Sequence, residues 1–139
     1  MRGLLGILAA AVLAATGCST GSTDPGLEEL RSRADELVPA TSEIVDVTEG
    51  ACLQVEGNPP CVRIYLTGDQ REAARADALE RSAREAGWEV VSRERVGGGT
   101  AFELEREGYR AFAAVWTISC PEGRVDRACA DEIQVVEEP

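Results

Sequence analysis

The amino-acid sequence predicts an α+β domain, a two-layer sandwich in which two helices pack on one face of an antiparallel β-sheet. Two segments carry apolar residues at helical spacing, and the segments between and after them alternate apolar with polar residues. Short loops containing glycine or proline separate the alternating segments, as in β-hairpins. We therefore expect the order α-ββ-α-ββββ, with both helices on one side of the sheet.

The first helix is expected over residues 27–38. Asp24 is a candidate N-cap, and Pro25 suits the first helical position, where a backbone N–H is not needed. Pro39 ends the helix, because proline cannot continue the hydrogen-bond ladder. The apolar stripe of this helix consists of Leu27, Leu30, Ala34, Leu37 and Val38.

The second helix is expected over residues 69–87. Asp69 and Glu72 have the spacing of a capping box, and Gly87 suits the C-terminal cap. Most inward-facing positions carry small residues, which would allow the helix to lie close to the sheet. These positions are Ala73, Ala76, Leu79, Ala83 and Ala86.

Six strand segments follow from the alternating pattern: residues 44–55, 62–66, 88–96, 102–104, 109–119 and 133–135. Turns at 57–60, 97–99 and 107–108 join neighbouring segments as hairpins. The Gly-Gly-Gly turn at 97–99 lacks the strand–helix context of a phosphate-binding loop. Each aromatic residue is expected in the core. Alternation also places one set of residues of 109–119 on a common face: Phe112, Ala114, Trp116 and Ile118.

The chain has a formal net charge of −11, and it contains neither lysine nor histidine. Such an acidic chain is not expected to bind nucleic acid, which requires a cationic surface. The lack of histidine excludes Ser–His–Asp and Cys–His catalysis and most zinc and copper sites. We therefore expect no enzymatic activity, no catalytic residue, no metal site and no cofactor.

Residues 1–17 have the layout of a signal peptide, with one arginine followed by an apolar run that ends in small residues. The run is shorter than the roughly 20 residues that a membrane-spanning helix needs. The motif Ala15-Thr16-Gly17-Cys18 resembles the lipobox of bacterial lipoproteins. That resemblance implies cleavage before Cys18 and attachment of membrane lipid to its sulfur. A secreted protein cleaved without lipidation is the alternative.

Residues 18–26 are small and polar, and we expect them to form a flexible tether that carries the lipid on Cys18. Residues 27–139 then form one extracytoplasmic domain. Two stretches of the domain, 80–91 and 109–115, also resemble small lipoproteins of actinobacteria in general style. That resemblance implies a location at the cell membrane and no assigned activity.

Four further cysteines follow Cys18. Four cysteines in an exported chain imply disulfides, for which three connectivities exist. Eight residues separate Cys52 from Cys61, and eight separate Cys120 from Cys129, so the matched spacing favours the pairs Cys52–Cys61 and Cys120–Cys129. A redox pair or a metal–thiolate cluster is the alternative, although neither CxxC spacing nor a histidine partner is present.

The leading hypothesis for function is a membrane-tethered, non-enzymatic module that binds an envelope protein or another envelope component through its helix surface or its open sheet face. Its specificity, its binding residues and its oligomeric state are open. A small-ligand carrier is one alternative, for which Trp88 and Trp116 would line a groove. A small hydrolase using a carboxylate pair is another, with Glu103 and Glu105 on one strand face as candidates.

Overall fold

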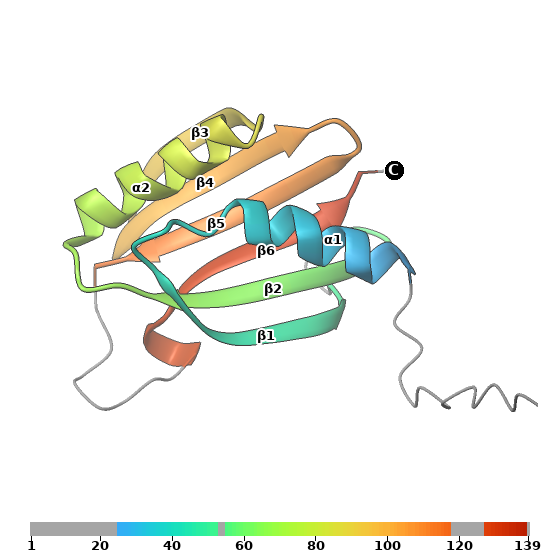
Figure 1. Ribbon diagram of the computed structural model, residues 1–139, viewed down its shortest axis with the longest axis horizontal. Coiled ribbons are helices and arrows are strands. Elements are labelled where there is room, and N and C mark those ends of the chain that lie inside the picture. The colour runs from blue at the N-terminus through green and yellow to red at the C-terminus, as the bar shows by residue number, and fades with distance from the viewer. Residues whose placement is uncertain (1–24, 53–54, 118–126, 139) are drawn as a thin grey trace, which may run out of the picture.

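A computed structural model describes residues 25–52, 55–117 and 127–138 (Figure 1). The residues before 25, including Cys18 and the expected leader, lie outside the described part. The described elements are α1 (Pro25–Glu36), β1 (Glu43–Ala51), β2 (Pro60–Thr67), α2 (Glu72–Glu85), β3 (Glu89–Val96), β4 (Gly99–Arg106), β5 (Tyr109–Trp116), the short 3-10 helix η1 (Arg127–Cys129) and β6 (Asp131–Glu137).

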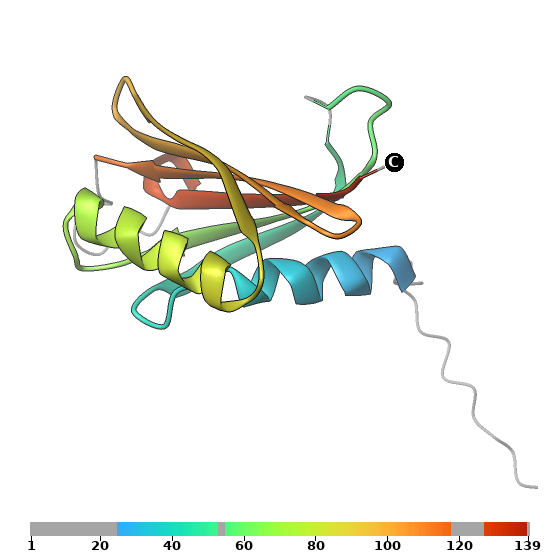
Figure 2. The same cartoon turned by 90° about the horizontal axis from the view of Figure 1, so that it is seen from above.

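The strands form a six-stranded sheet in the order β1-β2-β6-β5-β4-β3, and every neighbouring pair is antiparallel. The last strand, β6, lies in the middle of the sheet and joins the β1–β2 hairpin to the β3–β4–β5 meander. Both helices lie on the same side of the sheet, which Figure 2 shows from above. The predicted α+β class, element order and antiparallel sheet are therefore confirmed.

The core lies between the helices and the sheet. The helix α1 packs on β2 and β6, whereas α2 packs on the meander. The inward residues of α1 and α2 match the predicted stripes, with Ala73 exposed as the exception. The central core residues are Leu30, Ala34 and Leu37 from the α1 region, Ala76, Leu79 and Ala83 from α2, Val62, Ile64 and Leu66 from β2, Ile133 and Val135 from β6, and Phe102 and Leu104 from β4.

The start of α2 differs from the expected capping box. The helix begins at Glu72, and the cap residue Arg71 makes no side-chain cap hydrogen bond. The Glu72 carboxylate does not reach back to the cap, because it accepts a hydrogen bond of 2.5 Å from the Thr100 hydroxyl on β4. The C-terminal prediction is confirmed, since Gly87 has a φ of +87° just after the helix.

The structure of β5 corrects the expectation that every aromatic residue lies in the core. Alternation on this strand is as predicted, but Phe112 and Trp116 lie on the side of the sheet away from the helices. The helix-facing residues of β5 are Ala111, Ala113 and Val115, all buried. Small side chains at these positions leave room for the helices to approach the sheet.

The β1–β2 hairpin carries the expected disulfide between Cys52 and Cys61. These cysteines form a second small buried cluster with Val136 of β6, and Val55 packs against it. Cys120 lies outside the described residues, so the pairing Cys120–Cys129 stays a prediction. The helix α1 begins at Pro25, so the last two residues of the tether expected over 18–26 belong to the helix. Within the described part, no helix is long and apolar enough to cross a membrane.

Candidate functional site

The sheet face opposite the helices, called the open face below, is a candidate binding surface of the domain. Neither helix covers this face, because both lie on the other side of the sheet (Figure 2). The open face takes one residue set from each strand, because side chains of a strand alternate between the two sides of a sheet. Its central residues are Arg63 and Tyr65 from β2, Glu132 and Gln134 from β6, Phe112, Ala114 and Trp116 from β5, and Ala101 and Glu103 from β4.

The middle of the open face mixes aromatic and polar side chains. Phe112 lies directly opposite Gln134 on one side and Glu103 on the other. Gln134 in turn lies opposite Arg63, whose guanidinium is 3.8 Å from the Glu132 carboxylate. Half-buried aromatic side chains next to charged groups are typical of protein-binding surfaces.

One end of the open face is held by η1. The Arg127 guanidinium lies over the Tyr65 ring, 5.4 Å from its centroid, and pairs with the Asp46 carboxylate on β1. The hydrogen bond from Arg127 lowers the pKa of Asp46, and a second hydrogen bond from the Val47 backbone N–H, at 2.8 Å, acts in the same direction. Asp46 is therefore ionised at neutral pH and fixes η1 on the sheet.

The other end of the open face carries Arg110 of β5. Its guanidinium is 3.2 Å from Glu138, 3.5 Å from Glu105 and 3.8 Å from Glu103. Beside it, a cavity of about 550 Å³ separates the β1–β2 loop from the ends of β5 and β6. The lining residues are Val55, Glu56, Gly57, Pro59, Arg110, Val136, Glu137 and Glu138.

The candidate carboxylate pair of a hydrolase is found where the sequence places it, on one face of β4. Glu103 and Glu105 are, however, both ion-paired with Arg110 and about one-third exposed, at 35% and 37%. A general acid of a glycosidase needs a raised pKa. Two carboxyl groups outside this pair, Asp46 and Glu72, have a lowered pKa and therefore do not suit that role; at Glu72 the Thr100 hydroxyl and Arg95 lower it.

The groove between Trp88 and Trp116 that the alternative of a ligand carrier requires does not form. Trp88 is 3% exposed and lies in the core on the helix side, whereas Trp116 lies on the open face. The sheet therefore separates the two indoles. In the part of the chain that the structure describes, no three acidic or cysteine side chains are placed to hold a metal ion.

Sequence reasoning missed a buried ion pair between α2 and β6. Arg75 Nε lies 2.9 Å from Asp131 Oδ2, and both side chains are 7% exposed. Arg75 also donates to the backbone carbonyls of Gln70 and Trp116, and Asp131 accepts from the Trp116 N–H at 3.0 Å. The signal was present, because Arg75 lies four residues before Leu79 on the inward stripe and Asp131 alternates with Ile133.

Searches of protein-family models, of curated proteins and of solved structures found no match to this chain.

Proposed function

We propose that this chain is a lipoprotein, anchored through Cys18 to the extracytoplasmic face of a cell membrane, and that its domain is a non-enzymatic binding module. The observation that carries the binding role is the open face, on which Phe112 and Trp116 are only half-buried. A β-sheet with one solvent-facing side usually carries polar residues there. Large aromatic side chains on that side favour a contact with a partner, for which we propose an envelope protein.

The charged groups of the open face support binding over catalysis. Arg63, Arg110 and Arg127 each pair with carboxylates of neighbouring segments, so these carboxylates have arginine counter-ions. The chain also has no histidine to act as a base near neutral pH. Both observations are those expected of a recognition surface.

Anchoring is tested by growing cells with an alkyne analogue of palmitate and measuring its incorporation into the full chain. The wild-type protein is expected to take the label, and Cys18→Ala is expected to lose it and to leave the membrane fraction. Absence of label from both forms would support a secreted protein without lipid, and equal labelling of both forms would place the lipid at another residue; either result would contradict anchoring through Cys18.

The binding role is tested by in-cell photocrosslinking. The photoreactive residue benzoylphenylalanine replaces Phe112 on the open face, and as a control it replaces Arg81, which is exposed on α2. We expect one protein to be captured from position 112, not from position 81, and only when Cys18 is intact. Capture of the same proteins from both positions would contradict a binding role for the open face.

A small-ligand carrier is the second candidate, and one observation favours it. The cavity of about 550 Å³ beside Arg110 falls within the range of small-molecule sites, roughly 300–1,000 Å³. No crosslink from position 112, together with a ligand bound in this cavity, would support the carrier.

A further inference from the structure

The cavity beside Arg110 is built from three parts of the chain. Residues 55–59 of the β1–β2 loop lie on the side of the sheet away from the helices and form one wall (Figure 2). The start of β5 and the end of β6 supply the rest of the lining. The Cys52–Cys61 disulfide closes the base of the loop, so this wall is covalently tied to the sheet.

One side of the cavity is apolar. Val55 and Pro59 line it from the loop, and Val136 lines it from β6. Val136 is 3% exposed and packs against both cysteines of the disulfide, which makes this wall rigid. A surface of this kind suits a short aliphatic chain, because contact with it removes methylene groups from water.

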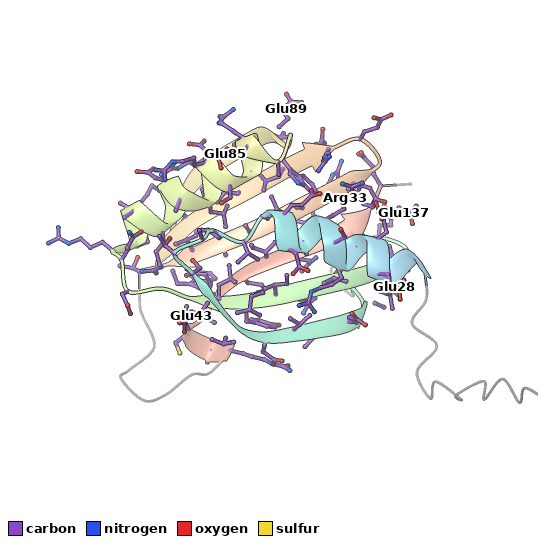
Figure 3. The ribbon with its side chains drawn as sticks, in the orientation of Figure 1. Glu28, Arg33, Glu43, Glu85, Glu89 and Glu137 are labelled. Carbon is purple, nitrogen blue, oxygen red and sulfur yellow. A yellow bond between two sulfur atoms is a disulfide. The ribbon has the colours of Figure 1, made fainter. Side chains whose placement is uncertain are left out.

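The remaining lining is acidic. Glu56, Glu137 and Glu138 line the cavity together with one cation, Arg110, which lies 3.2 Å from Glu138. That cation is shared, since the Arg110 guanidinium also lies 3.5 Å from Glu105 and 3.8 Å from Glu103. The cavity therefore keeps an excess of negative charge, and Glu137 projects from the end of β6 into solvent (Figure 3).

We propose that this cavity binds an organic cation carried on a short apolar chain, which is the chemistry of a lysine or arginine side chain and of a free alkylamine. The apolar wall holds the chain, and the carboxylates of β6 and the loop hold the cation. The excess of carboxylates would repel an anion. A neutral aliphatic ligand would leave the same carboxylates without a counter-charge. The inference deepens the binding role proposed above and rests on that role only for the source of the cation.

The test is calorimetric titration of the full chain with hexylamine, with hexanol and hexanoate as matched probes of the same chain length. We expect heat of binding for hexylamine alone, with affinity that falls as salt is added. Equal binding of hexylamine and hexanol would overturn the proposal, and so would no binding of hexylamine at millimolar concentration.

Three variants separate a charge effect from a change in fold. Glu138→Gln is expected to lower the affinity for hexylamine about threefold, because it removes one partly exposed ion pair with the ligand. Glu107→Gln removes the same charge from the β4–β5 turn, outside the cavity, and is expected to change affinity less than twofold. Arg110→Gln is expected to tighten binding about threefold, because it removes the competing cation. Weakening by both Glu138→Gln and Arg110→Gln would indicate structural damage and contradict the proposal.

Titration with a blocked tripeptide that has a central lysine distinguishes the two sources of the cation, a side chain of a partner protein and a free amine. Binding at least tenfold tighter than that of hexylamine would assign the cavity to a side chain of a partner protein. Equal or weaker binding would assign it to a free amine. Failure of the crosslinking experiment with intact hexylamine binding would overturn the protein-binding role and leave the cavity assignment standing.

Discussion

Removing the Asp131 carboxylate should strongly destabilise the fold. Asp131 holds the Arg75 guanidinium at 2.9 Å and accepts the Trp116 N–H at 3.0 Å. Both charged side chains are 7% exposed, so Asp131→Ala leaves a cation with no counter-ion in a nearly dry site and a backbone donor without its partner. Breaking a buried pair in this way typically costs about 3–5 kcal/mol.

That loss is large compared with the stability of a domain of this size. Single domains are stable by about 5–15 kcal/mol, so Asp131→Ala would remove about a fifth of the total or more. For a chain of this length the melting temperature is expected to fall by about 15 °C. The assay is urea unfolding followed by far-UV circular dichroism, with thermal melting as a second measurement.

Two comparisons test the reasoning. The double variant Arg75→Met/Asp131→Leu removes both charges and is expected to be more stable than Asp131→Ala, because buried pairs replaced by apolar residues cost little. The exposed pair Arg31–Asp35 serves as the control, and Asp35→Ala is expected to cost less than about 1 kcal/mol. A loss below 1 kcal/mol for Asp131→Ala, or a double variant at least as unstable as that single variant, would refute the argument.

Three further predictions concern local features. Replacing Cys52 and Cys61 by serine should cost about 2.5 kcal/mol through the entropy of the opened loop, measured by urea unfolding. Added reductant should destabilise that variant further, because it would break the predicted Cys120–Cys129 disulfide. The pKa of Glu72 is lowered in the folded state, so its contribution to stability is present at neutral pH and lost as the pH falls through that lowered pKa; Glu72→Gln should flatten the acid limb of stability measured against pH. A Cβ at Gly99 would lie 2.2 Å from a backbone carbonyl of β5, whereas a Cβ at Gly97 would meet nothing within 4 Å. Gly99→Ala should therefore lower the melting temperature clearly and Gly97→Ala should not, and equal effects would show that the close approach is not the cause.

The local elements were predictable because their signals are local. Helical periodicity predicts both helices, and Pro39 and Gly87 indicate where they end. Alternation of apolar and polar residues between turn residues predicts the hairpins. The position of β6 was not predictable in the same way. Its alternating Ile133 and Val135 indicate a strand with one buried face, but they do not indicate which strands lie beside it. Pairing of β6 with β2 joins residues about 70 positions apart, such as Ile64 and Ile133.

The prediction of which face of β5 points into the core was wrong for a different reason. Alternation defines two faces, and residue size then suggests that the bulky aromatic set is inside. In this sheet the helices supply the volume, through Leu30, Leu37 and Leu79, so β5 contributes small residues beneath them. The aromatic side chains consequently lie on the open face, where they carry the proposed binding role. Capping at Asp69 failed because Glu72 had a stronger partner in the Thr100 hydroxyl, which sequence spacing does not show.

The cavity beside Arg110 was predictable only in part. Local sequence signals predict its loop wall, since the cysteine spacing and the turn at 57–60 indicate a disulfide-closed hairpin. They do not predict its charge, because Arg110, Val136 and Glu138 meet the loop only once β6 has paired between β2 and β5. A loop closed by a disulfide loses little conformational freedom when a ligand binds, so more of the contact energy appears as affinity. The Cys52–Cys61 disulfide should therefore matter for binding beyond its effect on stability: at a temperature where the serine variant is fully folded, we expect its hexylamine affinity to be lower than that of the wild-type chain.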